Sequence, residues 1–317
     1  MTSTIPLVKL NNGKYIPALG LGTFKIAHLT EEIVGQAIDQ GYRLIDTAPV
    51  YQNNEVAVGR AIRQKIREGV VTREEMFVVS KLWNTHHSKG EVTAACEKSL
   101  RFLSVDYIDL YLINWPFGLK SNTRDHFKKQ EFYAFDTTSI EDTWKEMETL
   151  VSRGLVRSVG VANFNTGQLE RILKIAKYKP VVNQIETNVR LVQEEILQFC
   201  KARDIVVMGY RPLGAPGRKI ELTPEEEWQV VIESNHNLIE IGKKYKKTPA
   251  QVCLRYLVEL GVVPIPKTAE EARLKENMDI FDFKLDVEDT KYIQTLHTNY
   301  RITHYEAAKA HKEYPFK

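Results

Sequence analysis

An aspartate, a tyrosine and a lysine stand near the ends of two predicted strands and could together deliver a proton. Asp46 ends the apolar run 42–45, and Tyr51 lies in the turn that follows. Lys81 ends a second apolar run, 77–80. A lysine ammonium beside the phenol would stabilise tyrosinate and lower the pKa of Tyr51, and the aspartate would keep that lysine charged and in place. Taken singly, the three residues are better explained as a helix N-cap, a packed tyrosine and a surface lysine.

Strand and helix patterns alternate along the chain and would carry these residues to one rim. Strands are expected at 17–22, 42–46, 77–81, 107–113, 156–161, 181–185, 205–209 and 262–266. Helices are expected at 30–40, 53–67, 88–103, 141–153, 166–176, 192–203, 236–260 and 270–278. A helix after each of eight apolar strands is typical of an α/β protein with a (β/α)8 TIM barrel.

The start of the chain adds a β-hairpin, because an Asn-Asn-Gly turn separates two short strand patterns within 6–16. No linker or repeat divides residues 1–317, which we expect to form a single barrel domain. A doubly wound fold is the structural alternative and would open its first helix with three spaced glycines. The segment that begins with Gly20 and Gly22 has Lys25 where the motif has its third glycine, so the barrel is favoured.

Composition excludes several classes of protein. A chain of 317 residues with 43% hydrophobic residues can bury a large core. The net charge of +3 is too small to indicate nucleic acid or a membrane surface as a partner. No apolar run approaches the roughly 20 residues that cross a bilayer.

The cysteines predict a reducing compartment. The chain has three of them, Cys96, Cys200 and Cys253, widely spaced and without a Cys-x-x-Cys motif. This odd number and the lack of a signal-peptide pattern predict a cytoplasmic protein. No His, Cys or carboxylate spacing is typical of a metal site, so no metal is expected.

Three segments are longer than barrel connections require: 116–138, 213–233 and the tail 299–317. The first two follow strands four and seven, so they are expected as long loops over the C-terminal mouth, where barrel active sites lie. All three contain aromatic residues among polar ones. We expect the tail to close a third side of the mouth.

The residues at the carboxyl ends of the predicted strands are almost all polar or aromatic. They are Thr23, Phe24, Asp46, Lys81, Asn114, Trp115, Asn163, Gln184, Glu186, Tyr210, Lys267 and Thr268. Burying so many polar groups around one rim is costly unless they bind something. The rim is therefore predicted to be a functional site.

Motifs along nearly the whole chain resemble those of the aldo-keto reductase superfamily. They are L-G-L-G-T at 19–23, G-Y-R-L-I-D-T-A at 41–48, Tyr51, S-K-L-W at 80–83, D-Y-I-D-L-Y-L at 106–112, G-V-A-N-F-N at 160–165, N-Q-I-E at 183–186, P-L-G at 212–214 and I-P-K-T at 265–268. The resemblance is to aldose-reductase-like members, including an insect branch of carbonyl and ecdysteroid ketone reductases. It implies a monomeric (β/α)8 barrel that reduces aldehydes or ketones to alcohols with NADPH, which becomes NADP+.

The resemblance also implies roles for particular residues. Tyr51 would be the general acid, assisted by Lys81 and Asp46, with Asn114 as a fourth catalytic residue. Tyr210 would stack on the nicotinamide. The wider set expected to bind the cofactor is Thr23, Phe24, Asp46, Asn163, Gln184, Tyr210, Arg211, Leu213, Lys267, Thr268, Arg273, Glu276 and Asn277. Within it, Asn163 and Gln184 would bind the carboxamide, and Lys267 and Arg273 the 2′-phosphate. The set expected to contact the substrate is Phe24, Val50, Trp83, Trp115 and Phe117.

The chain departs from the family pattern at four positions. Asn114 stands where the family has a histidine that orients the carbonyl oxygen, although Asn still offers an N–H donor. Ala162 replaces a serine that contacts the carboxamide, and Phe24 replaces a tryptophan. Arg211 replaces a small residue and would either add a cation near the pyrophosphate or point outward.

The missing histidine keeps a second function open. Potassium-channel β subunits resemble this chain in carrying Asn at this position, and they are slow reductases. The alternative to an enzyme is therefore an NADPH-binding sensor or subunit with vestigial activity. His126 or His86 could replace the histidine from a loop, although loop histidines are usually only solvated. For an enzyme, the apolar wall favours hydrophobic or aromatic carbonyls, steroid ketones among them, over free sugars.

Overall fold

The computed structural model describes residues 5–51, 54–120, 134–214 and 232–317. Within these ranges eight parallel strands form one sheet in chain order. The strands are β3 (Leu21–Gly22), β4 (Leu44–Asp46), β5 (Phe77–Leu82), β6 (Leu110–Ile113), β7 (Val159–Ala162), β8 (Val182–Glu186), β9 (Val206–Tyr210) and β10 (Val262–Pro264). The sheet closes on itself, because the N–H groups of Gly20 and Gly22 donate to Pro264 and Pro266 at 3.1 Å each. A Cβ on Gly22 would lie 2.9 Å from the carbonyl oxygen of Ile265, so the seam requires glycine there.

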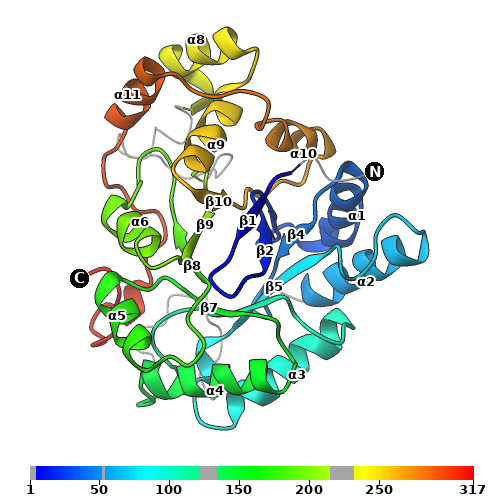
Figure 1. Cartoon of the computed structure of the whole chain (residues 1–317), viewed down its shortest axis with the longest axis vertical. Coiled ribbons are helices and arrows are strands. Elements are labelled where there is room, and N and C mark those ends of the chain that lie inside the picture. The colour runs from blue at the N-terminus through cyan, green and yellow to red at the C-terminus, as the bar shows by residue number, and fades with distance from the viewer. Residues whose placement is uncertain (1–4, 52–53, 121–133, 215–231) are drawn as a thin grey trace.

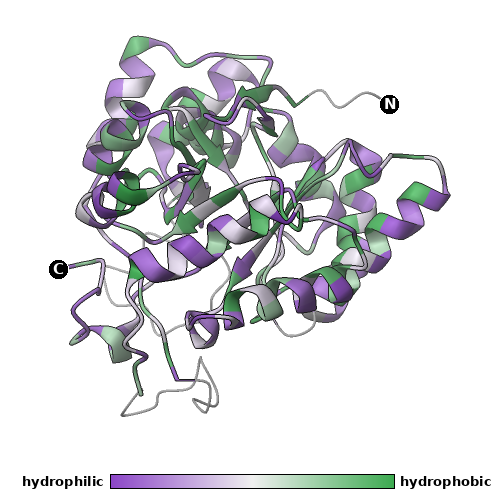
Figure 2. Cartoon of the chain, turned by 60° about the horizontal axis from the view of Figure 1, so that its bottom comes forward, coloured by the Kyte–Doolittle hydropathy of each residue, from purple (hydrophilic) through white to green (hydrophobic). Residues whose placement is uncertain are grey.

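Helices surround the strands on the outside of the barrel (Figure 1). They are α1 (Thr30–Gln40), α2 (Asn54–Arg67), α3 (Glu91–Leu103), α4 (Ile140–Ser152), α5 (Thr166–Ile175), α6 (Glu194–Lys201), α8 (His236–Tyr245), α9 (Pro249–Glu259), α10 (Glu271–Met278) and α11 (Val287–Thr295). Three short 3-10 helices are η1 (Ala27–Leu29), η2 (Asn84–His86) and η3 (Glu306–Ala308). Many helices show both hydrophilic and hydrophobic residues, as surface helices with one buried face do (Figure 2).

Two hydrophobic clusters hold the barrel together. One lies between the sheet and the helices, and buried residues of α1 such as Ile33 and Ile38 belong to it. The other fills the barrel interior with Leu44, Val79 and Leu112 among its members. Because strands of a barrel bury both faces, each face needs apolar residues, which explains the lack of clean alternation in the strand sequences.

The predicted N-terminal hairpin is present and closes one end of the barrel. Its strands β1 (Leu7–Lys9) and β2 (Tyr15–Pro17) pair antiparallel, and in Figure 1 they cross the centre of the ring. Leu10 and Ile16 join the interior cluster. The side-chain amide of Asn12 donates to Ser158 Oγ at 2.9 Å, just before β7 begins. The hairpin therefore covers the amino end of the strands, and the predicted site lies at the other end.

The barrel prediction is confirmed, with two errors among the helices. The helix expected at 236–260 is two helices, since the backbone of Lys246 is left-handed and Thr248 caps α9 together with Gln251. Pro249 occupies the first turn of α9, where its missing N–H costs nothing. The sequence analysis also missed α11. In the described ranges, none of the helices has the length and apolar character to span a membrane.

Candidate active site

Asp46 and Lys81 form a buried ion pair at the ends of the neighbouring strands β4 and β5. Lys81 Nζ donates to both carboxylate oxygens at 2.7 Å and to the carbonyl oxygen of Thr47 at 3.0 Å. Gln184, from β8, donates to Asp46 Oδ2 at 2.7 Å. Only 1% of Lys81 and 3% of Asp46 is exposed. The pair is thus fixed on rigid strands, and loss of either partner would leave a buried charge unpaired.

Tyr51 completes the predicted triad. Its ring centre lies 5.2 Å from Lys81 Nζ and 4.9 Å from the ring centre of Phe24. The backbone N–H of Tyr51 donates to Ala48 at 3.1 Å, so a tight turn after β4 positions the ring. This arrangement can donate a proton from the phenol to an oxygen atom placed above it.

The expected direction of the Tyr51 pKa shift is wrong. Burial, followed by the nearby Asp46 carboxylate, raises the pKa of Tyr51 well above its ordinary value, and the Arg211 guanidinium opposes this. Lys81 is not among the causes of this shift, as expected for an ammonium whose charge Asp46 compensates. Burial also lowers the pKa of Lys81, whereas the Asp46 carboxylate acts to raise it. Tyr51 is therefore a neutral phenol at neutral pH, which is the form a proton donor needs.

Three further predicted residues are linked across the rim. Asn163 has a left-handed backbone with φ of 62°, which asparagine tolerates better than most residues. Its Nδ2 donates to the carbonyl oxygen of Asn114 at 2.9 Å, and Tyr210 donates its O–H to Asn163 Oδ1 at 2.7 Å. Asn114, at the end of β6, is 8% exposed. Asn114, Asn163 and Tyr210 thus come together from β6, β7 and β9.

The two alternative histidines are His86 and His126. His86 lies in η2 and bonds to Thr85 Oγ1 at 2.9 Å through Nδ1. Burial and the Lys98 ammonium lower the pKa of His86. His126 lies outside the described residues.

The residues expected to bind the 2′-phosphate lie just after β10 and in the first turn of α10. Lys267 is exposed, and its pKa is lowered by partial burial and by the charges of Arg211 and Lys25. Arg273 pairs with Glu270 at 3.2 Å at the start of α10. The two predicted cations thus lie within six residues of each other along the chain.

The remaining residues of the expected cofactor set are mostly engaged in structure. Thr23 is fully buried and donates to the carbonyl oxygen of Asp46 at 2.9 Å. Thr268 Oγ1 accepts the N–H of Glu270 at 3.0 Å. Glu276 accepts from Thr248 at 2.6 Å. The final two are Asn277, which is buried, and Leu213, which packs against the main core.

Arg211 is half-buried and connected to the C-terminal tail. Its charge lowers the pKa of both Tyr51 and Lys267. Its Nε donates to Thr303 Oγ1 at 2.9 Å. The contact joins the rim to the C-terminal tail.

The predicted substrate wall is assembled together with the tail. Val50, Trp83, Trp115 and Phe117 share one cluster with the tail residues Ala308, Tyr305, Tyr314 and Phe316. Trp115 packs edge-on against Tyr305, with ring centres 5.2 Å apart. Phe24 instead packs against Tyr51. The expectation that the tail closes one side of the mouth is confirmed.

Two buried carboxylates hold the tail, and the sequence analysis missed both contacts. Glu186 is fully buried and accepts the N–H groups of Ile302 and Thr303 at 2.8 and 2.7 Å. Glu313 accepts two bonds from Arg171 of α5 at 2.9 Å. A glutamate at the end of an apolar strand was the signal for Glu186.

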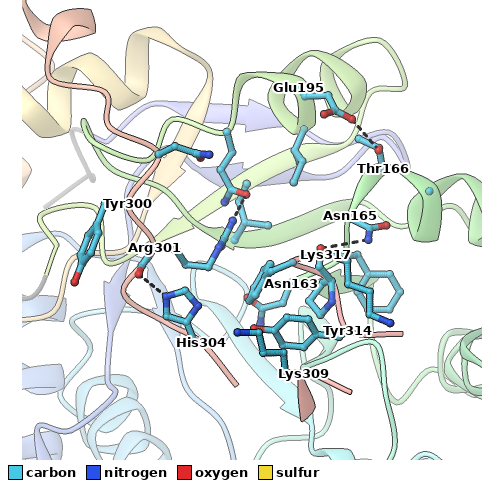
Figure 3. Close-up of a pocket in the computed structure, with 18 of the residues that line it drawn as sticks. Asn163, Asn165, Thr166, Glu195, Tyr300, Arg301, His304, Lys309, Tyr314 and Lys317 are labelled. Carbon is cyan, nitrogen blue, oxygen red and sulfur yellow. Dashed lines mark hydrogen bonds between the residues drawn. The ribbon is translucent and has the colours of Figure 1, made fainter. Parts of the chain in front are cut away.

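A cavity of about 910 Å³ lies between the tail and the starts of α5 and α6. Figure 3 shows Arg301 and His304 of the tail on one side, with Asn165 and Thr166 at the start of α5 on another. Asn163 lines the same cavity. The tail and Asn163, one of the two residues expected to bind the carboxamide, therefore line the same cavity.

A further buried carboxylate, also missed, lies behind Lys81. Glu55 of α2 is 1% exposed and accepts from Ser80 Oγ at 2.6 Å. Burial raises the pKa of Glu55, while the Ser80 hydrogen bond and the Lys81 charge lower it. Because Ser80 and Lys81 are neighbours in β5, their side chains point to opposite faces, and Glu55 supports the strand from outside.

Comparisons with known proteins agree on one family. The model of the Aldo/keto reductase family matches residues 18–298. The chain is 43% identical to prostaglandin F synthase 1 of cattle, Bos taurus, over 98% of this chain and 97% of that protein. It is 41% identical to estradiol 17 beta-dehydrogenase 5 of the mouse, Mus musculus, over 100% and 99%. A crystal structure of an aldo-keto reductase of Bombyx mori in complex with NADP superposes with a TM-score of 0.88 at 35% identity, covering 99% of each chain.

Proposed function

We propose that this chain, which belongs to the Aldo/keto reductase family, uses Tyr51 to protonate the oxygen of apolar aldehydes and ketones as they are reduced to alcohols. The chain is an NADPH-dependent carbonyl reductase. The observation that supports Tyr51 as the acid is its place beside Lys81, whose ammonium is held by both oxygens of Asp46. NADPH, when bound, supplies the hydride for the carbonyl carbon.

The triad divides the work of proton transfer. Tyr51 gives its O–H proton to the carbonyl oxygen on which negative charge develops. The Lys81 ammonium stabilises the tyrosinate that remains. Asp46 keeps Lys81 charged and fixed, and the low dielectric of the buried pair strengthens both interactions.

The rim residues fit a phosphorylated nicotinamide dinucleotide. Among the described residues, no carboxylate pairs with Arg211 or Lys267, so these cations are available to an anion. We propose that Lys267 and Arg273 hold the 2′-phosphate through charge-assisted hydrogen bonds. The side-chain amides of Asn163 and Gln184 are proposed to bind the carboxamide beside the ring of Tyr210.

Asn114 is proposed to orient the carbonyl oxygen with one neutral hydrogen bond. It is 8% exposed and sits on a strand end next to Trp115 of the substrate wall. Because asparagine cannot become cationic, it stabilises a developing oxyanion less than a protonated histidine would. This observation also favours the second candidate, a cofactor-binding sensor with weak reductase activity.

The substrate class proposed is a large apolar or aromatic carbonyl compound. The supporting observation is the aromatic cluster of Trp83, Trp115 and Phe117, closed by Tyr305 and Phe316 of the tail. An apolar substrate that packs against this wall gains binding free energy from the apolar area it buries. The wall offers few hydrogen-bonding groups for the hydroxyls of a free sugar. Two relatives are named for a prostaglandin and for estradiol, which are large and mostly apolar molecules.

One experiment separates the enzyme from the sensor. NADPH oxidation is measured with aromatic aldehydes, steroid ketones and free sugars, and NADPH affinity is measured separately. The proposal expects the highest kcat/KM with the aromatic and steroid compounds. Tight NADPH binding with negligible turnover across the whole panel would instead identify a sensor. Preference for sugars would overturn the proposed substrate class.

We also propose that residues 1–317 act as one domain, as a monomer, in the cytoplasm. The continuous main core, which includes residues from Ile5 to Ile293, supports a single domain. The buried state of all three cysteines is compatible with a reducing compartment. Sedimentation at micromolar concentration tests the monomer, and fractionation tests the location.

A further inference from the structure

Arg211 has a backbone conformation that side chains rarely adopt. It follows Tyr210 at the end of β9 with φ of 51°. Residues with a Cβ are disfavoured in the left-handed region of backbone conformation. Arginine is not one of the residue types, such as asparagine, that adopt this region more readily. Residues kept in such conformations are often held for a functional reason, and what holds Arg211 is visible around it.

The Arg211 side chain reaches two different parts of the site. On one side its charge acts on Lys267, together with that of Lys25, so three cations gather where the cofactor phosphates are expected. On the other side its Nε donates to Thr303 Oγ1 in the tail at 2.9 Å. Like charges repel, so an anionic group between these cations would hold them in place.

Thr303 belongs to a short strap of the tail that is tied to the barrel by polar contacts. The N–H groups of Ile302 and Thr303 donate to the buried carboxylate of Glu186. Arg301 donates to Gln193 Oε1 at 2.8 Å, and Gln193 in turn donates to the carbonyl oxygen of Glu186. A shift of the strap would break several of these bonds together, so its residues are expected to move together and not singly.

The strap leads directly into the substrate wall. Tyr305 comes two residues after Thr303 and packs against Trp115 and Phe117 at ring-centre distances of 5.2 and 5.3 Å. Arg211 is thus connected to the substrate wall by its hydrogen bond to Thr303 and by the ring contact of Tyr305 with Trp115. Its charge acts on Lys267 at the other end.

We propose that Arg211 couples cofactor binding to the substrate wall, by gripping a phosphate of the dinucleotide while its Nε holds Thr303 of the strap. The inference rests on the proposed function and deepens it. A phosphate fixes the guanidinium, and the fixed guanidinium fixes Thr303 and therefore Tyr305. Because coupling between two sites is reciprocal, NADPH tightens carbonyl binding and an apolar carbonyl ligand tightens NADPH binding, by roughly 5-fold each. Arg211 is a positioning residue toward the substrate.

Three substitutions separate the two contacts. Arg211→Ser removes both of them. Arg211→Lys keeps the charge and loses the Nε donor. Thr303→Val keeps the shape and loses the acceptor. The chain also offers a matched control, because Arg190 Nε donates to Thr298 Oγ1 at 3.0 Å just before the tail, on the exposed surface. Thr298→Val removes an equivalent bond away from the rim.

The readouts are NADPH affinity, amide hydrogen exchange in residues 300–305 with and without NADPH, and KM for an apolar aldehyde. In the unmodified chain NADPH should slow exchange in 300–305. In Arg211→Lys and Thr303→Val that slowing should disappear and KM should rise roughly 5-fold. In Thr303→Val, which leaves the guanidinium in place, kcat and NADPH affinity should stay within about 2-fold of the unmodified chain. Arg211→Ser should weaken NADPH binding roughly 10-fold or more. Thr298→Val should behave as the unmodified chain, and exchange in α2 checks that each variant is folded.

Two results would overturn the coupling. One is NADPH slowing exchange in 300–305 equally in Thr303→Val and in the unmodified chain. The other is unchanged NADPH affinity in Arg211→Ser. Failure of the proposed function is a different result, since the unmodified chain would then fail to turn over carbonyl compounds whatever its exchange pattern.

Discussion

Two ends of the rim, the one proposed for catalysis (the catalytic end) and the one proposed to bind phosphate (the phosphate end), are built in opposite ways. Lys81 and Asp46 are almost fully buried and joined by bonds of 2.7 Å. Lys267 is exposed, and the side chain of Arg273 is 49% exposed and pairs with Glu270 at 3.2 Å. The first pair is held on strand ends within the sheet. The second pair sits on a loop and the first turn of a helix, where long side chains remain free to move.

This difference determines when the side chains at each end lose their conformational entropy. A preorganised buried pair has lost its side-chain entropy on folding and needs no rearrangement when a substrate arrives. Exposed lysine and arginine side chains lose that entropy, of order 1–2 kcal/mol each, only when they bind a phosphate. Changes at the catalytic end should therefore alter kcat, and changes at the phosphate end should alter affinity.

The largest expected effect tests the catalytic end. Tyr51→Phe removes the proton donor and should lower kcat by roughly 10²–10⁴. NADPH affinity should stay within about 2-fold, because the phenol is not expected to contact the phosphates. Steady-state and binding measurements on the same preparation decide. Tyr292→Phe is the matched control, since its hydroxyl bonds to Asn235 on the outer helices. A Tyr51→Phe enzyme that retains most of its rate would assign the proton to water or another group.

The next effect tests the phosphate end. Arg273→Ala should weaken NADPH binding roughly 10- to 100-fold, since one charge-assisted contact contributes about 1.5–3 kcal/mol. NADH binding should change little, and kcat at saturating NADPH should be unchanged. Titrations with both dinucleotides test this, with Arg60→Ala, an exposed arginine of α2, as control. Equal losses for both dinucleotides would show that Arg273 does not read the 2′-phosphate.

The sequence predicted the catalytic end because the signal is local. Asp46 and Lys81 each end an apolar run, and parallel strands bring their ends to one rim. The break at Thr248 and Pro249 was equally local, and the sequence analysis overlooked it. The links from Glu186 to Thr303 and from Arg171 to Glu313 join residues more than a hundred positions apart. No spacing in the sequence encodes such pairs, since they depend on where the tail crosses the mouth.

A smaller effect is expected at Asn114, which lies between the two ends. Asn114→Ala removes one neutral donor to the carbonyl oxygen and should lower kcat roughly 5- to 10-fold, in line with about 1 kcal/mol for such a bond. Asn114→His should raise kcat on simple aldehydes if the ring fits beside Trp115. Kinetics with one good aldehyde test both variants. An Asn114→Ala enzyme as fast as the unmodified chain would leave Asp46, Tyr51 and Lys81 as the working group.

The smallest expected effect concerns pH. We expect kcat to be independent of pH near neutrality, which tests the pKa of Tyr51. The sequence predicted a lowered pKa, whereas in the fold burial and Asp46 raise the pKa of Tyr51 well above 10. A general acid works while it is protonated, so activity is lost only as the pH rises through its pKa. A raised pKa therefore predicts that kcat for reduction stays level between about pH 6 and about pH 9.

The pH profile separates two accounts of Lys81. If Asp46 compensates the Lys81 charge, the ammonium holds the tyrosinate after proton transfer but does not acidify the phenol beforehand. The profile is then level. If Lys81 acts on the phenol before transfer, kcat falls with a midpoint below about pH 9. The profile is measured at saturating NADPH and aldehyde, so that kcat reports the bound state.

Asp46→Asn adds a second test, because loss of the carboxylate removes one of the two influences that raise the Tyr51 pKa. The midpoint in that variant should move to lower pH than in the unmodified chain, and an unchanged profile would show that Asp46 does not act on Tyr51.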